Sequence, residues 1–160
     1  MPAPPRDAAR VRILPPGVPL ITILLGQVLQ RFRPIAPPLE LSPLVRYGLG
    51  GAIVLAAMMG LGYRAVRTMH GTGQDANPWK PTPSIIDSGP YRFSRNPMYL
   101  QLVIICIGFA LLLRNPWILL LTPVAAWVLQ RFAIRPEEEY LERKFGETYL
   151  AYKRRVRRWI

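Results

Sequence analysis

Four stretches of the chain are nearly free of charged residues, and polar segments separate them. They cover residues 20–29, 47–63, 98–113 and 116–130. About 20 apolar residues in a helix cross the roughly 30 Å hydrocarbon core of a bilayer, and the second run reaches this length with its flank at residues 44–46. The pattern predicts an all-α integral membrane protein with about four transmembrane helices, or three if the short first run does not span.

Only Arg114 and Asn115 separate the third and fourth runs, which predicts an antiparallel helical hairpin over residues 98–134. Each of these runs measures only about 23 Å at 1.5 Å per residue. We expect interfacial aromatic side chains to complete the span, and the candidates are Tyr99, Trp117, Trp127 and Phe132. In the second run, small residues recur at every fourth position, which favours close packing inside the molecule or in a dimer: Gly48, Ala52, Ala56 and Gly60.

Polar segments complete a single domain over residues 1–160. Residues 1–17 form a basic, proline-rich tail, and residues 18–67 hold the first two spans. Residues 68–97 have no helical or alternating period and predict a long loop, whose length favours a function. Residues 135–160 predict an amphipathic helix on the membrane surface, with Glu137 to Glu139 at its N-terminus, where carboxylates stabilise the helix dipole. Glu139 is expected to pair with Arg143, one turn further on.

Composition and charge agree with a membrane protein. The chain is 51% hydrophobic and 19% charged, yet its formal net charge is +12. Of its 21 lysines and arginines, 17 lie before the first apolar run, between the second and third runs, or after the fourth. The positive-inside rule therefore places these three segments in the cytosol. Beside a membrane helix, the basic run at residues 153–158 is expected to attract anionic lipid rather than nucleic acid.

Cys106 and His70 are the only cysteine and the only histidine of the chain. The sequence therefore predicts no intramolecular disulfide and no metal site. It also holds no G-x-G-x-x-G motif after a strand, so a soluble dinucleotide-binding fold is not expected.

Two polar clusters fall on the predicted cytosolic side. The first is Gly89-Pro90-Tyr91-Arg92 followed by Arg95-Asn96-Pro97-x-Tyr99, and the second is Glu137-Glu138-x-x-Leu141-x-x-x-Phe145-Gly146-x-x-Tyr149-x-x-Tyr152. Together they resemble the paired motifs of the isoprenylcysteine carboxyl methyltransferase and phospholipid methyltransferase superfamily of integral membrane enzymes, over residues 71–158. Two positions depart from the pattern. Asn96 stands where eukaryotic members carry histidine, and Gln101 places bulk where glycine is usual.

The resemblance implies S-adenosylmethionine as the cofactor, a lipidic or prenylated acceptor, and a site on the cytosolic face, which we expect to be that of a bacterial inner membrane. Arginine can bind the cofactor carboxylate with two hydrogen bonds, and glutamate can accept from its ammonium or ribose. By this resemblance Arg95 and Glu138 are the expected catalytic residues. The residues expected at the cofactor are Tyr91, Arg92, Arg95, Asn96, Pro97, Tyr99, Glu137 and Glu138.

The identity of the acceptor stays open on the sequence. A carboxylate that attacks the sulfonium annihilates charge, so an apolar pocket favours the transition state and no base is needed. A phospholipid amine must first lose a proton, and Glu138 is then the expected base. Two further readings are a nicotinamide-dependent membrane reductase, whose C-terminal half is similar, and a non-catalytic membrane adaptor with a basic tail.

Overall fold

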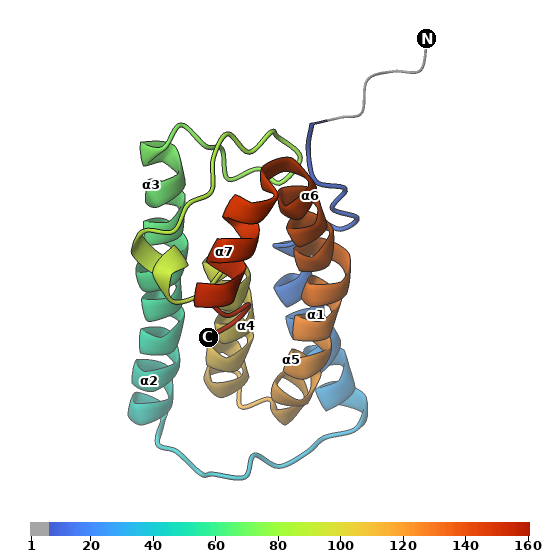
Figure 1. Cartoon of the computed structure of the whole chain (residues 1–160). Helices are drawn as coiled ribbons and strands as arrows, with labels where there is room; N and C mark the ends of the chain where they lie inside the picture. Colours follow the sequence, from blue (N-terminus) through green and yellow to red (C-terminus); the bar gives the residue numbers. More distant parts are fainter. Residues whose placement is uncertain (1–6) are drawn as a thin grey trace.

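The computed structural model describes residues 7–160, and this part of the chain contains helices and irregular segments but no strand. Each predicted apolar run forms a helix, and these helices lie side by side (Figure 1). The elements are α1 (Gly17–Phe32), α2 (Pro43–Ala56), the π-helical η1 (Ala57–Tyr63), α3 (Arg64–Gly71), the 3-10 helix η2 (Gly89–Arg92), α4 (Pro97–Leu112), α5 (Pro116–Leu129), the π-helical η3 (Gln130–Ile134), α6 (Arg135–Phe145) and α7 (Glu147–Arg155).

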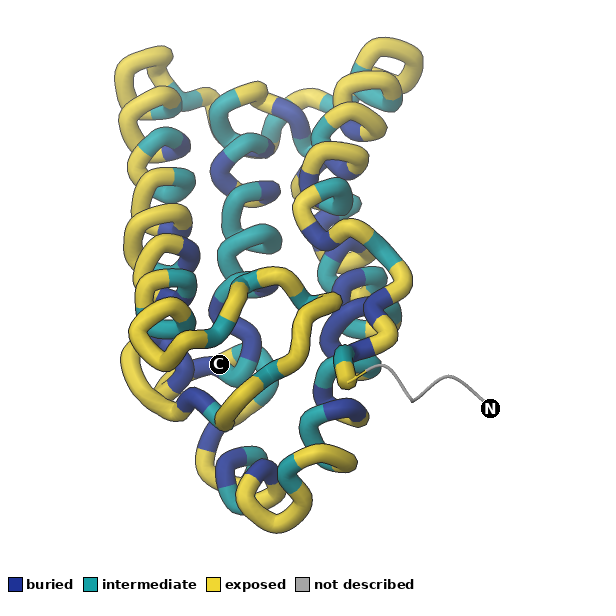
Figure 2. The backbone as a smooth tube through the Cα atoms, turned by 90° about the horizontal axis from the view of Figure 1, so that it is seen from above, coloured by how far each residue is buried: buried dark blue, intermediate teal, exposed yellow. Residues whose placement is uncertain are grey.

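Two continuous helices are long and apolar enough to cross a membrane. Elements α2, η1 and α3 join into the 29-residue helix Pro43–Gly71, and α5, η3 and α6 join into the 30-residue helix Pro116–Phe145. Helices α1 and α4 are apolar but have 16 residues each. Outward-facing leucines and isoleucines are exposed on the helices (Figure 2), as a surface in contact with lipid requires. The fold is consistent with a membrane protein, and four spans stay a prediction.

Helix α4 contacts α1, α2 and α5, and its closest approach to α2 occurs at glycines. A Cβ atom added to Gly50 would lie 3.2 Å from the Gly108 carbonyl oxygen, and one added to Gly108 would lie 3.2 Å from that of Gly50. The predicted stripe from Gly48 to Gly60 makes no such contact, since all four of its residues are exposed. The expectation that this stripe packs inside the molecule is therefore wrong, because α2 turns a different face toward α4.

The predicted hairpin forms, and Asn115 caps its second helix. The Asn115 side-chain oxygen accepts hydrogen bonds from the backbone N–H groups of Trp117 and Ile118, at 3.0 and 3.4 Å. Its Nδ2 donates to the Gln27 side-chain oxygen on α1, at 2.6 Å. One buried asparagine thus fixes both the turn and the position of α1 against the hairpin.

No single amphipathic helix forms over residues 135–160, and this prediction is wrong. Helix α6 continues α5 through η3, so Glu137 to Glu139 lie inside a long helix and not at its start. Pro136 has no N–H to offer to the Phe132 carbonyl, which accepts instead from the Arg12 N–H at 3.1 Å. The helix ends at Gly146, whose φ of 51° only glycine adopts easily, and α7 turns back.

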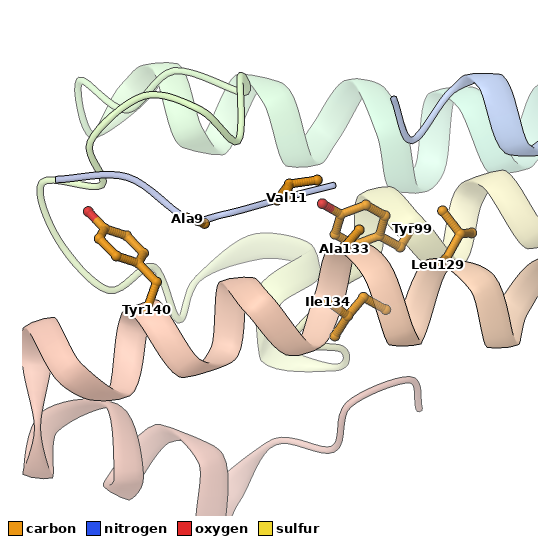
Figure 3. Packing of buried hydrophobic residues seen from close by; sticks show 7 residues of the cluster. All are labelled: Ala9, Val11, Tyr99, Leu129, Ala133, Ile134 and Tyr140. Atoms are coloured by element: carbon orange, nitrogen blue, oxygen red, sulfur yellow. The ribbon is translucent and has the colours of Figure 1, made fainter. Parts of the chain in front are cut away.

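The N-terminal segment is packed, whereas the sequence suggested a tail. Residues 1–6 lie outside the described part of the chain. Residues 7–16, which we call the strap, run alongside α6 in an extended conformation, with Ala9 and Val11 buried among Tyr99, Ala133 and Tyr140 (Figure 3). Hydrogen bonds also hold the strap at its start and in its middle. The Tyr140 hydroxyl donates to the Asp7 carboxylate at 3.0 Å, and the Trp79 indole N–H donates to the Val11 carbonyl at 3.1 Å.

Candidate active site

The two predicted motifs meet at the end of the helix bundle where the strap lies. Asn96 directly precedes α4, and Glu138 lies on α6, just beyond the apolar part of its long helix. The Arg95 Nη2 donates to Glu138 Oε1 at 2.8 Å, although 43 positions separate these residues in the sequence. Both side chains are at least nine-tenths buried. The prediction that distant motifs form one site is thus supported by a direct ion pair.

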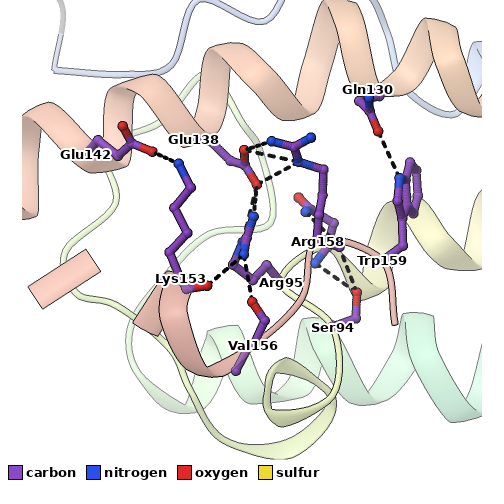
Figure 4. A network of polar contacts seen from close by, with 10 residues as sticks. Ser94, Arg95, Gln130, Glu138, Glu142, Lys153, Val156, Arg158 and Trp159 are labelled. Carbon is purple, nitrogen blue, oxygen red and sulfur yellow. Dashed lines mark hydrogen bonds and ion pairs between the residues drawn. The ribbon is translucent and has the colours of Figure 1, made fainter. Parts of the chain in front are cut away.

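Glu138 is bound from two sides (Figure 4). Besides Arg95, Arg158 donates to it, with Nη2 2.7 Å from Glu138 Oε2. Burial raises the pKa of the Glu138 carboxyl, but the hydrogen bonds from Arg158 and Arg95 outweigh burial and bring this pKa below its ordinary value. Glu138 is therefore a carboxylate that holds two cations, and it is poorly suited to accept a proton.

Arg95 uses its remaining donors to hold the C-terminal segment. Its Nη1 donates to the Val156 carbonyl at 2.6 Å and to the Lys153 carbonyl at 3.2 Å, at the end of α7. Its backbone N–H donates to the Arg157 carbonyl at 3.0 Å. Its Nε and Nη2 both donate to Glu138, so this guanidinium has no free pair of N–H groups with which to bind a cofactor carboxylate. Arg95 positions the site, which differs from the direct cofactor contact that the resemblance implies.

Asn96 has a similar structural task. Its Nδ2 donates to the Arg158 carbonyl at 3.0 Å, and its backbone N–H donates to the Ser94 hydroxyl at 3.0 Å. An asparagine serves here because the contact needs a donor and no titration. Pro97 follows as the first residue of α4, where its missing N–H costs nothing.

Glu137 lies in a different environment from its neighbour Glu138. It accepts a hydrogen bond of 2.5 Å from the Tyr99 hydroxyl, and no lysine or arginine of residues 7–160 forms an ion pair with it. Burial raises the pKa of this carboxyl most, the hydrogen bond from Tyr99 lowers it and repulsion by Glu138 raises it, and together they bring the pKa to about 7. Glu137 is thus able to exchange a proton near neutral pH.

A cavity of about 790 Å³ joins these residues. Of the residues predicted at the site, all but Arg92 line it: Tyr91, Arg95, Asn96, Pro97, Tyr99, Glu137 and Glu138. Arg92 is exposed and absent from the wall, because the short helix η2 turns it outward while it buries Tyr91. The expected part of Arg92 at the cofactor is therefore not supported by its position.

Sequence reasoning missed several residues of the wall. Met58 and Tyr63 come from η1, Leu14 and Pro16 from the strap, and Trp79 from the loop. The 17-residue apolar run gave no sign of η1, since a π-helical turn has no distinct composition. Gln74 also lines the cavity, and its side-chain oxygen is buried with no hydrogen-bond partner among residues 7–160. Arg158 was missed because the basic run suggested lipid attraction for all of its members.

The bulk of Gln101 is accommodated by a glycine on the neighbouring helix. A Cβ atom added to Gly62 in η1 would lie 2.0 Å from the Gln101 side-chain oxygen. Gly62 thus leaves room for the larger Gln101 side chain, which lines the cavity at this point.

Residues 45–148 match the model of the family described as phospholipid methyltransferase, which is more than half of the chain. The chain belongs to this family. The matched segment contains the first motif and the second as far as Gly146, and the superfamily resemblance is confirmed. The strap, α1 and Arg158 lie outside it.

Three relatives are similar over shorter stretches. A protein-S-isoprenylcysteine O-methyltransferase of Saccharomyces cerevisiae is 38% identical over 72 residues, 45% of this chain and 30% of the yeast protein. One from Xenopus laevis is 37% identical over 73 residues, 46% of this chain and 25% of that protein. An uncharacterised protein of Haemophilus influenzae is 43% identical over 63 residues, 39% of this chain and all of that protein. The chain thus spans less than a third of the two named relatives. No solved structure matches.

Within residues 7–160, no three histidine, cysteine or acidic side chains gather as a metal site would require. His70 lies exposed at the end of α3, and Cys106 is a buried free thiol in α4. The family match and these helices together support a membrane methyltransferase.

Proposed function

We propose that this protein transfers a methyl group from S-adenosylmethionine to a lipidic or prenylated acceptor at the cytosolic face of a membrane, and that carboxyl O-methylation is the activity. The observation that carries the proposal is one cavity whose wall contains residues of both motifs. One part of this wall is polar, with Glu137 and Gln74, and another is apolar, with Met58 and Leu102. A site that binds both a charged nucleotide and an apolar acceptor requires a wall with polar and apolar parts.

The residues present fit such a cofactor through acceptors. Glu137 has no cationic partner among the described residues, and the Gln74 side-chain oxygen is buried without a donor. An ammonium, a ribose hydroxyl or an adenine amino group would satisfy either of them. Arg95, Glu138 and Arg158 would hold the wall in place. Arg95 and Glu138, which the resemblance implies as catalytic residues, are then positioning residues. When bound, S-adenosylmethionine supplies an electrophilic methyl group, which is bonded to its positively charged sulfonium sulfur.

For a carboxylate acceptor, the oxygen–methyl bond forms as the sulfur–methyl bond breaks, and two opposite charges disappear. Such a transition state is favoured by an apolar, water-poor wall, and no protein group has to move a proton. Exclusion of water by the strap and the loop is then the main contribution of this chain.

N-methylation of a phospholipid amine is a second candidate, which Glu137 favours. An ammonium must lose a proton before its nitrogen attacks, and a carboxyl with a pKa of about 7 can take that proton. Glu138, the base expected from the sequence, is engaged by two arginines and does not suit this task.

Calorimetry of the detergent-purified full chain tests the proposal directly. We expect saturable binding of S-adenosylmethionine and of its demethylated product, and none of a nicotinamide dinucleotide. Glu137→Gln should weaken binding about tenfold with the unfolding temperature preserved, whereas the exposed control Arg92→Ala should change neither. Transfer of a labelled methyl group to a prenylated cysteine analogue or to phosphatidylethanolamine then separates the two acceptors. The absence of binding of both the methyl donor and its product would contradict the methyltransferase proposal and favour a non-catalytic adaptor.

A further inference from the structure

A second hollow lies against the strap, next to the reaction cavity. It has a volume of about 860 Å³, and we call it the basic groove. Its walls come from the strap, from η3 and from α6, and contain five cations and two carboxylates: Asp7, Ala8, Arg10, Arg12, Arg131, Pro136, Glu139, Tyr140, Arg143 and Lys144. The strap has an alternating pattern, in which Ala9 and Val11 are buried in the core while Arg10 and Arg12 are exposed at the groove.

The arginines of the groove form no ion pair within residues 7–160. In this part of the chain, seven of the nine acidic residues form ion pairs, and the one such pair in the groove is Lys144 with Asp7, at 2.7 Å. The expected pair between Glu139 and Arg143 is not formed, because no ion pair of residues 7–160 includes either of them. Residues 1–6 hold no acidic residue that could reach the groove. Four guanidinium groups thus face one hollow outside any ion pair of the described residues, and Glu139 is the one carboxylate there that is not already paired.

The basic run at residues 153–158 shows the opposite behaviour. Lys153 pairs with Glu142, Arg154 with Glu147, and Arg155 with Asp87. Arg158 pairs with Glu138. The lipid attraction expected of this run is therefore largely offset by neighbouring carboxylates. Four arginines outside any ion pair of residues 7–160 line the basic groove instead.

The position of the groove identifies the kind of anion. Arg131 is the first charged residue after the apolar stretch of the long helix, so it lies where hydrocarbon ends. Beside it, Phe132 packs edge-on against the exposed Trp127, with ring centroids 6.1 Å apart. Exposed aromatic side chains with neighbouring arginines are typical of the headgroup level of a membrane. A phosphate at this level belongs to a lipid, whose chains can follow the exposed face of α5.

We propose that the basic groove binds the phosphate of an anionic phospholipid headgroup, held by Arg10 and Arg12 of the strap and by Arg131 and Arg143 of the long helix. Guanidinium groups bind phosphate oxygens with paired hydrogen bonds. A headgroup bound there bridges the strap to α6. Since the strap also forms part of the wall of the reaction cavity, the lipid stabilises the closed wall by mass action.

Native mass spectrometry of the detergent-purified full chain, titrated with phosphatidylglycerol or phosphatidylcholine, tests this site. We expect phosphatidylglycerol to bind at least tenfold more tightly than phosphatidylcholine. Arg10→Gln with Arg12→Gln should weaken phosphatidylglycerol binding about 30-fold, which corresponds to about 1 kcal/mol for each basic residue at a lipid surface. The matched control, Arg154→Gln with Arg155→Gln, removes the same charge from paired residues and should change the affinity less than threefold.

The remaining outcomes are also decisive. An equal loss in both double variants would assign the binding to net charge and overturn the groove. Inorganic phosphate that displaces phosphatidylglycerol at comparable concentrations would show that a free anion, and not a lipid, is the occupant. The unfolding temperature of each variant in detergent alone shows whether the strap variant is folded, and Arg131→Gln, on η3, repeats the test without touching the strap. The result is independent of methyl transfer, because only lipid binding is measured.

Discussion

Glu137 and Glu138 are neighbours in the sequence, yet they have opposite environments. Glu138 is an ionised carboxylate between two arginines, and Glu137 is a half-buried carboxyl that, among the described residues, accepts a hydrogen bond from a tyrosine hydroxyl and is repelled by Glu138. Consecutive helix positions point about 100° apart, so one α6 turn can serve two surfaces. The comparison shows that one carboxylate holds the motifs together while the other is left available to a ligand.

The largest expected effect comes from removing the charge of Glu138. Glu138→Gln leaves Arg95 buried without its counter-charge, and breaking a buried pair in this way costs about 3–5 kcal/mol. We expect a clear fall in the unfolding temperature in detergent, measured by scanning fluorimetry. Glu139→Gln, an exposed neighbour outside any ion pair of the described residues, is the matched control and should be nearly neutral. Equal stability of the two variants would break the comparison.

An intermediate effect is expected at Arg158. Its side chain is about a third exposed, and Arg158→Gln leaves Arg95 in place, so the loss should be about 1.5–3 kcal/mol, the range of hydrogen bonds to charged groups. Arg157→Gln removes an exposed arginine one position away and should cost less than about 0.5 kcal/mol. Chemical denaturation of both variants in the same detergent measures the difference, which should vanish in a Glu138→Gln background.

The effect with the sharpest dependence on pH is expected at Glu137. Its pKa in the folded protein, about 7, lies above the ordinary 4.5, so the folded state binds the proton more tightly than the unfolded state. Stability from this group is therefore present below pH 4.5 and is lost as pH rises toward 7. The difference in unfolding temperature between the wild type and Glu137→Gln should change over this interval and stay flat above it.

The same pKa separates the two candidate reactions. If the acceptor is an amine, the rate of methyl transfer should rise with pH through about 7 in the wild type, and Glu137→Gln should remove that dependence. With a carboxylate acceptor, the rate should stay flat between pH 6 and 8 in both proteins. Rates with the two labelled acceptors, measured over this range, decide between them.

Much of this fold was accessible from the sequence. Apolar runs gave the helices, and the two-residue link at Arg114 and Asn115 gave the hairpin. Motif resemblance paired the loop with the C-terminal segment, and the family match agrees. The prediction of a separate C-terminal helix failed at Pro136, because a proline usually lies at the start of a helix. Here the long helix continues through η3, and the strap supplies the N–H that Pro136 lacks. The stripe from Gly48 to Gly60 does not pack inside the molecule, and its packing in a dimer stays a prediction.

The detailed roles at the site were less accessible. Sequence spacing placed Glu137 and Glu138 together but could not say which of them meets arginine, since this depends on where the C-terminal segment folds back. Arg158 joins the site only because Asn96 and Arg95 bind backbone carbonyls nearby. The cytosolic orientation, derived from the distribution of lysine and arginine, stays a prediction.

Pro136 has a consequence for protein engineering. Any other amino acid at this position restores an amide proton that competes with Arg12 for the Phe132 carbonyl. A Pro136→Ala substitution is usually made to straighten and stabilise a helix. Here it would weaken the attachment of the strap, which forms part of the wall of the neighbouring cavity. The imperfection in the helix is what lets a second piece of chain attach to it.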